Sequence, residues 1–490
     1  MSYNRVGSTA DQSDYNNEEV EFIDLETAAQ TDHGPISKPN FNTRSRCSLG
    51  LISCVIQKSI CYPPPDPSKL KPTSWLDGVR GIAALEVFIF HTIGCWASIV
   101  PAWQWDEKNN LRVNILQFPF IRTFFVSGGA AVCVFFVLSG YVLTHKSLRW
   151  IREGSSHQVY PAVGSSMFRR GFRLYIPPIC LTFVEMLATR FGFAPPLSFG
   201  FVGEASLLGQ VGDWIKEVNH WVNPFFNFLT SIRGSINHMR YDAVVWTIPL
   251  EFYGSFMCYI LLLVLVRIPG NRMRMSLVAA TSVCFMLLGS WNMFCFSAGM
   301  LLADFNLGQD EKDTVTSPRA SIIWSIIFAA SFYVAGFPTL MMGEMPMPGF
   351  EFLLHLTPTS LHLEDRARFL WSISGVLLLL SISQLPRLKA IFETNFSQYL
   401  GKIAFSLYLV HEFCIQLFGL GIQGILFKLT GLEPRANTLM YWLVCVVWYL
   451  LFTLPVFAVA AQVERWVDAP SVRFARWLEG KCLKVYRSWK

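Results

Sequence analysis

Three ionisable side chains interrupt the apolar stretch VRGIAALEVFIFH at residues 79–91: Arg80, Glu86 and His91. An ionisable side chain inside a bilayer costs at least ~2.5–3.5 kcal/mol on insertion scales, so such residues are usually paired or functional. Arg80 and His91 are eleven residues apart, and therefore share one helix face, about 16 Å apart along the axis. Each alone also fits a structural role, as a snorkelling anchor or an interhelical hydrogen bond. Together they favour a conduit with an anion site at one end and a titratable base at the other.

Two further apolar stretches carry groups that can move protons. VVWTIPLEFYG places Thr247 and Glu251 one helical turn apart, and FSLYLVHEF contains Tyr408 and His411. A carboxylate in such a stretch is hard to explain as a lipid contact, so we expect it to face the protein interior. With His91, these residues form an inventory for general acid/base chemistry.

A cluster of arginines suggests where an anionic substrate binds. FRRGFRLYIPP places Arg169, Arg170 and Arg173 at the start of an apolar stretch. Guanidinium groups around a helix start can bind phosphates, although the same cluster also fits a signal for cytoplasmic retention. FFVLSGYVL adds Ser139 and Tyr141, which can hydrogen-bond across helices.

A metal site is the less favoured interpretation of the histidines. His91, His411 and Glu251 offer suitable ligand atoms, but no close spacing of His, Cys or carboxylate residues supports such a site. We therefore predict no metal and no tightly bound cofactor.

The elements that must position these residues are membrane helices. The chain of 490 residues is 52% hydrophobic and 15% charged, whereas soluble proteins average about 25% charged residues. Its apolar residues form runs of 15–25 residues, the length that crosses a bilayer. We predict an all-α polytopic membrane protein with about ten transmembrane helices, at 76–100, 126–145, 174–192, 244–266, 275–289, 291–305, 320–337, 369–385, 399–422 and 438–463.

Lys and Arg residues in the predicted loops indicate the orientation. If the N-terminus is cytoplasmic, 20 of them fall on the cytoplasmic side and 11 on the other, which predicts that both termini are cytoplasmic. We divide the chain into a largely disordered cytoplasmic region at 1–73, a transmembrane domain at 74–465 and a basic amphipathic tail at 466–490. The tail resembles an interfacial helix on an anionic leaflet.

The chain resembles the acyltransferase 3 family of integral membrane O-acyltransferases. The matching motifs are LDGVRGIAALEVFIFH, FFVLSGYVL, RRGFRLYIPP, VWTIPLEFYG and FSLYLVHEF, in the family's order across residues 74–465. The long N-terminal region and the ending VERWVDAPSVRFARWL are similar to the fungal-type branch. The resemblance implies ten helical spans, transfer of an acyl group, often acetyl, from cytoplasmic acyl-CoA to a hydroxyl, and essential roles for Arg80 and His91.

We therefore predict a membrane O-acyltransferase that uses acyl-CoA, with acetyl-CoA as the first choice, as co-substrate and acylates a glycan, lipid or secondary metabolite. The expected partners are acyl-CoA, the acceptor and the bilayer, and not nucleic acid; the sequence does not separate endomembrane from plasma membrane. An acyl-His intermediate ranks below direct transfer, with a secondary transporter or a non-catalytic scaffold as alternative functions. The predicted residues are His91, Glu251, His411 and Tyr408 for catalysis, Arg80, Arg169, Arg170, Arg173, Ser139 and Tyr141 for the donor, and Trp246 and Thr247 for the acceptor.

Overall fold

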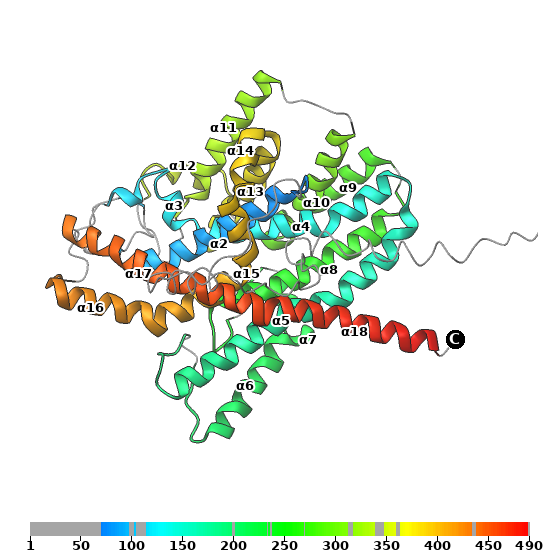
Figure 1. Cartoon of the computed structure of the whole chain (residues 1–490). Helices are drawn as coiled ribbons and strands as arrows, with labels where there is room; N and C mark the ends of the chain where they lie inside the picture. Colours follow the sequence, from blue (N-terminus) through cyan, green and yellow to red (C-terminus); the bar gives the residue numbers. More distant parts are fainter. Residues whose placement is uncertain are drawn as a thin grey trace, which may run out of the picture.

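The chain folds into a bundle of helices (Figure 1). The computed structural model describes residues 70–97, 102–103, 114–197, 201–232, 234–235, 238–268, 270–311, 317–338, 347–358, 363–433 and 438–488. Within these ranges no β-strand forms, and an isolated bridge joins Leu197 to Asp242. The chain is an all-α polytopic membrane protein, as predicted. The predicted disordered region at 1–73 lies almost entirely outside the described residues.

Each predicted span overlaps a long helix. These helices are α2 (Ser74–Gly94), α4 (Gly128–Arg152), α5 (Val159–Arg190), α8 (Thr247–Leu265), α9 (Asn271–Leu287), α10 (Trp291–Asp310), α11 (Pro318–Ala335), α13 (Leu363–Gln384), α15 (Asn395–Cys414) and α17 (Leu439–Val463).

Seven helical segments of the described chain are long and apolar enough to cross a membrane. The helices α2, α9 and α10 are not among them. Helix α2 carries Asp77, Arg80 and Glu86, α9 is only 17 residues long, and α10 is buried along most of its length. Because a helix inside a bundle touches protein rather than lipid, it tolerates more polar residues. The number of spans and the cytoplasmic position of both termini therefore stay predictions.

Glycines bring α2 into close contact with α15. A Cβ atom on Gly81 would collide with the backbone of Leu400 and Gly401, and one on Gly401 would collide with the backbone of Asp77. Small residues at such crossings allow two membrane helices to approach closely. The close pairing directs the helix face that carries Arg80 and His91 toward α15.

Glycines also bring α4 into close contact with α10. A Cβ atom on Gly140 would collide with the backbone of Phe296, and one on Gly299 would collide with the backbone of Val137. The Ser-Gly-Tyr sequence of α4 therefore marks a helix crossing, with Ser139 and Tyr141 on either side of the glycine.

Helix α17 continues through a π-helical turn, Glu464–Asp468, into α18 (Ala469–Ser488), so that the two helices form one long rod (Figure 1). The predicted amphipathic tail is thus helical. Helix α18 packs along α5, where Arg169 Nε lies 3.2 Å from Glu479 Oε2 and the rings of Phe172 and Phe474 are 6.1 Å apart.

Shorter helices connect the long ones. Helices α6 (Leu207–Val222) and α7 (Pro224–Ile232) project from the bundle between α5 and α8 (Figure 1). A π-helical turn, Ile415–Gly419, joins α15 to α16 (Leu420–Thr430). The remaining short helices are α3 (Thr123–Val126), α12 (Glu351–Leu354) and α14 (Pro386–Phe392), with 3₁₀ turns at Ile115–Gln117, Ser156–Gln158 and Val244–Trp246.

Candidate active site

Arg80 and His91 both face α15, as their shared helix face predicts. The guanidinium of Arg80 donates a hydrogen bond of 2.6 Å to the carbonyl oxygen of Gly401, and it lies 3.7 Å from the carboxylate of Asp77. His91 lies three turns further along α2, beside the end of α15. Arg80 and His91 therefore lie near opposite ends of the contact between α2 and α15.

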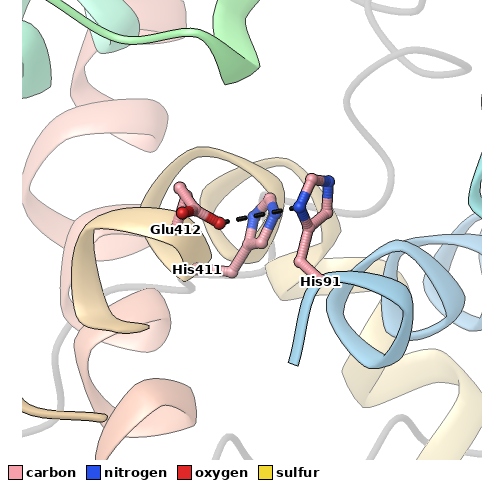
Figure 2. A group of neighbouring side chains, drawn as sticks. All are labelled: His91, His411 and Glu412. Atoms are coloured by element: carbon pink, nitrogen blue, oxygen red, sulfur yellow. Dashed lines mark ion pairs between the residues drawn. The ribbon is translucent and has the colours of Figure 1, made fainter. Parts of the chain in front are cut away.

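His91 belongs to a group of three side chains that converge between α2 and α15 (Figure 2). Its Nδ1 lies 3.6 Å from Oε2 of Glu412, and its ring lies 4.8 Å from the ring of His411, measured between centroids. The side chains of His91 and Glu412 remain 36% and 22% exposed, whereas His411 is fully buried. His91 is therefore partly accessible, whereas His411 is accessible only after a rearrangement.

The hydrogen bond of His411 defines its tautomer. Its Nδ1 lies 2.7 Å from the carbonyl oxygen of Tyr408, one turn earlier on α15. Because a carbonyl only accepts, Nδ1 must carry the proton. The other nitrogen, Nε2, is buried without a hydrogen-bond partner and therefore keeps its lone pair in this tautomer.

Glu412 also accepts a hydrogen bond from the π-helical turn that follows α15. Nε2 of Gln416 donates a hydrogen bond of 3.1 Å to Oε1 of Glu412. Gln416 lies in the π-helical turn after α15, and such turns occur frequently at functional sites. One carboxylate oxygen thus accepts from Gln416, while the other faces His91.

A cavity of about 170 Å³ opens among α2, α4, α5, α8 and α15. Seven predicted site residues line it: Arg80, Ser139, Arg170, Arg173, Thr247, Glu251 and Tyr408. Its lining also includes Lys402, which was not predicted, and the carboxylates of Asp77 and Asp468. Four cationic side chains therefore border one cavity, at the end predicted to be cytoplasmic.

Glu251 is bound to an arginine of this cavity. The guanidinium of Arg170 donates a hydrogen bond of 2.5 Å to Oε1 of Glu251 and another of 2.8 Å to the hydroxyl of Ser255. Arg170 is 8% exposed, and a buried charge needs such a partner. The geometry connects Glu251 with Arg170 at the cavity, and Glu412 with His91.

Tyr408 and Thr247 meet at the cavity wall nearest the histidines. Their hydroxyl oxygens are 2.8 Å apart, and the hydroxyl of Tyr408 donates to the carbonyl oxygen of Val244. The ring of Tyr408 lies 6.0 Å from that of His411. Neither His91 nor His411 lines the cavity; Tyr408, which does line it, connects the cavity wall with His411.

Besides His91 and His411, three further predicted site residues do not line this cavity. Arg169 pairs with Glu479 of α18. Tyr141 accepts a hydrogen bond from Asn306 and stacks on His145. Trp246 is half-buried in the 3₁₀ turn before α8. Glu86, the third ionisable residue of the opening motif, has a structural contact, because it accepts hydrogen bonds from the backbone and hydroxyl of Ser127 at the start of α4.

Sequence reasoning did not select Glu412 or Lys402. Glu412 follows His411 directly, and adjacent residues on a helix point about 100° apart, so the pattern offered no reason to prefer it over Glu251. Lys402 stands alone in an apolar stretch and resembles a snorkelling residue. Lys402 follows Gly401, whose carbonyl oxygen accepts a hydrogen bond from Arg80, so its place near that arginine became visible only once α2 and α15 were known to pair.

A buried carboxyl group lies near this group of three. Asp242 precedes α8, is 2% exposed, and accepts a hydrogen bond of 2.8 Å from the backbone N–H of Val244. Burial, together with the negative charge of Glu412, raises the pKa of Asp242 above its usual range. Asp242 thus favours the protonated form more than an exposed aspartate does.

The residues that could hold a metal ion, among those described, are His91, His411 and Glu412, whose ligand atoms all lie within 4.8 Å of one another. Two histidines and a glutamate match the ligand set of some catalytic zinc sites. Glu251, considered in the sequence-based trio, is not a member. A metal ion on His91 would leave that imidazole without a free lone pair, so metal binding and general-base catalysis exclude each other at this residue.

The match to a family model identifies the class of protein as a membrane-bound acyltransferase. The chain belongs to the acyltransferase 3 family, whose acyltransferase-domain model matches residues 73–461. This membership confirms the resemblance found in the sequence motifs and favours an enzyme over the transporter and scaffold alternatives.

Fungal acyltransferases are similar to this chain over most of their length. An O-acetyltransferase of Phomopsis amygdali, PaAT-1, is 28% identical over 85% of this chain and 86% of its own. Acyltransferase clz18 of Cochliobolus lunatus is 25% identical over 83% of this chain and 95% of its own, and acyltransferase R4 of a Phoma species is 23% identical over 83% and 96%. These relatives agree with the fungal-type branch. No solved structure matches the chain.

Proposed function

We propose that this acyltransferase transfers a short acyl group, with acetyl as the first choice, from cytoplasmic acyl-CoA to a hydroxyl of a glycan, lipid or secondary metabolite. One observation carries the proposal. A cavity bordered by Arg80, Arg170, Arg173 and Lys402 leads toward Tyr408, and His91 with Glu412 lies beyond that residue. The name of PaAT-1, an O-acetyltransferase, supports both the acetyl group and the oxygen acceptor.

The donor would bind with its phosphates at the cationic end of the cavity. Coenzyme A carries a diphosphate and a further phosphate, and Arg or Lys side chains bind such groups through charge-assisted hydrogen bonds. The pantetheine arm would follow the apolar part of the cavity wall, which includes Val132, Phe135 and Phe405. This arrangement directs the thioester toward the histidines.

His91 would act as the general base. With Nδ1–H facing Glu412, its Nε2 can take the proton of the acceptor hydroxyl while that oxygen attacks the thioester carbonyl. The carbon–sulfur bond then breaks, and the proton passes from His91 to the departing CoA sulfur. Glu412 would hold the ring orientation and stabilise the imidazolium. The catalytic roles predicted for Glu251, His411 and Tyr408 stay predictions.

The test is a transfer assay on the full-length protein in lipid vesicles. Purified protein is incubated with acetyl-CoA labelled in the acetyl group and with one acceptor from each class, and the release of CoA is measured alongside the labelled product. Wild-type protein should label at least one hydroxyl acceptor, and the His91→Gln variant should not. A failure to label any hydroxyl compound in a whole extract, with correctly inserted protein, would contradict the proposed donor or the proposed acceptor chemistry.

A further inference from the structure

The acyl group is the leading end of the donor as it enters the cavity. If the phosphates of acyl-CoA bind near Arg80 and Arg173, the acyl group is the first part to meet the opposite wall. That wall contains Tyr408 and Thr247, and His91 lies beyond it. The acyl group must therefore pass this pair before the thioester can react.

The pair forms a hydrogen-bonded closure. The hydroxyls of Thr247 and Tyr408 are 2.8 Å apart, and Tyr408 also donates to the carbonyl of Val244. Tyr408 is 8% and Thr247 7% exposed. Each such hydrogen bond contributes about 0.5–1.5 kcal/mol to stability. Two such bonds favour one position of the Tyr408 ring but can be broken when the ring moves.

The segment that contains Val244, on one side of the closure, is held in place by hydrogen bonds. The side chain of Asp242 accepts from the N–H of Val244, and Arg240 donates to Glu217 and Asp213 of α6. Because these contacts fix the segment before α8, the passage opens most easily by movement of the Tyr408 ring rather than of the backbone around Val244. The width of the opening then depends on how far that ring can turn against Thr247.

We propose that Tyr408 and Thr247 select the acyl group by size, admitting acetyl and discriminating against longer chains; this inference rests on the proposed function. A short acyl group needs a small displacement of the Tyr408 ring, whereas each further methylene must be accommodated between the ring and α8. One methylene in a tightly lined pocket changes kcat/KM by about 10- to 200-fold. The pair would thus determine which acyl-CoA reaches His91, in addition to any role in orienting the acceptor.

The experiment compares acetyl-, butyryl- and hexanoyl-CoA as donors for one acceptor. Three variants alter the closure: Thr247→Ala widens it, Thr247→Val removes a hydroxyl at nearly constant volume, and Tyr408→Phe removes both hydrogen bonds but keeps the ring. The measured quantity is kcat/KM for hexanoyl-CoA divided by that for acetyl-CoA. Thr247→Ala should raise this ratio by about 10-fold or more, and Tyr408→Phe and Thr247→Val should raise it by a smaller factor.

A matched control widens the same cavity away from the closure. Leu143 lines the cavity from α4, and Leu143→Ala should leave the ratio within about two-fold of wild type. An equal rise in Leu143→Ala and Thr247→Ala would overturn the proposal, because overall cavity size would then set the preference. An unchanged ratio in Thr247→Ala would overturn it as well. If wild-type protein transfers none of the three acyl groups, the proposed function fails instead, so the two failures are distinguishable.

Discussion

Nδ1 of His91 on α2 lies 3.6 Å from Oε2 of Glu412 on α15, although the two residues are far apart in the sequence. The contact links the opening motif of the family match to its last motif. At this distance the carboxylate can orient the imidazole, which is what the proposed general base would need. The side chain of His91 is 36% exposed and so remains partly accessible.

Glu412→Gln should lower kcat by about 10- to 100-fold, because the amide no longer supplies the charge that orients and stabilises the histidine. The KM for acyl-CoA should change little. Steady-state kinetics with varied acyl-CoA measure both constants. Glu251→Gln is the matched control, since Glu251 contacts Arg170, and it should raise the donor KM more than it lowers kcat. A Glu412→Gln enzyme with wild-type kcat would show that the carboxylate does not assist His91.

His91→Gln should reduce turnover by about 10²- to 10⁴-fold, the contribution that general-base catalysis typically makes. Glutamine keeps hydrogen-bonding capacity but cannot accept and hold a proton. His411→Gln should cost less, because His411 is buried and donates to the carbonyl of Tyr408. Turnover is compared at equal amounts of correctly inserted protein. Substantial turnover by His91→Gln would move the catalytic assignment to His411 and Glu412.

Much of the fold could be predicted from the sequence, because membrane helices are recognised from the length and hydropathy of their apolar segments. The helix face shared by Arg80 and His91 is likewise a local property of one helix, and both side chains do face one partner helix. The spacing therefore predicted a relationship that the structure contains. The exact number of spans stays a prediction, because α2, α9 and α10 are not among the helices long and apolar enough to cross a membrane.

Partners between helices could not be predicted, because sequence spacing does not say which faces meet. Glu251 resembled the partner of the histidine, yet it lies with Arg170, and the carboxylate beside His91 is Glu412. Likewise, the arginines predicted at a helix start lie inside α5, which begins at Val159, and the sequence does not say which of them faces which neighbouring helix. Arg169 faces α18, while Arg170 and Arg173 line the cavity.

Removal of divalent metal ions should leave activity unchanged. His91, His411 and Glu412 could ligate a metal ion, but a base at His91 requires an unligated imidazole. Protein dialysed against a chelator should therefore keep its turnover, and metal analysis of the purified protein should find less than one equivalent per chain. Loss of activity on chelation, restored by zinc, would replace the general-base mechanism with a metal-assisted one.

Membrane orientation can be tested with single-cysteine variants in sealed vesicles. His157→Cys lies between α4 and α5, and Lys216→Cys lies on α6; both positions are exposed. An impermeant thiol reagent should label position 157 from the cytoplasmic side and position 216 from the opposite side, as the distribution of Lys and Arg predicts. The reverse pattern would move the donor entry to the other face of the membrane.

Substitutions of Arg173, Lys402 and Arg169 test the proposed donor site. Arg173→Lys keeps the charge but loses the planar fork that binds phosphate oxygens in pairs, and Lys402→Met removes a charge at similar length. Because both side chains line the cavity, each substitution should raise the KM for acyl-CoA several-fold while leaving the KM for the acceptor close to wild type. Arg169→Lys is the matched control from the same helix, since Arg169 pairs with Glu479 and does not line the cavity. Initial rates at varied acyl-CoA distinguish the three variants. If Arg169→Lys raises the donor KM as much as Arg173→Lys, the arginines act through α5 and α18 as a whole, and the cavity is not the phosphate site.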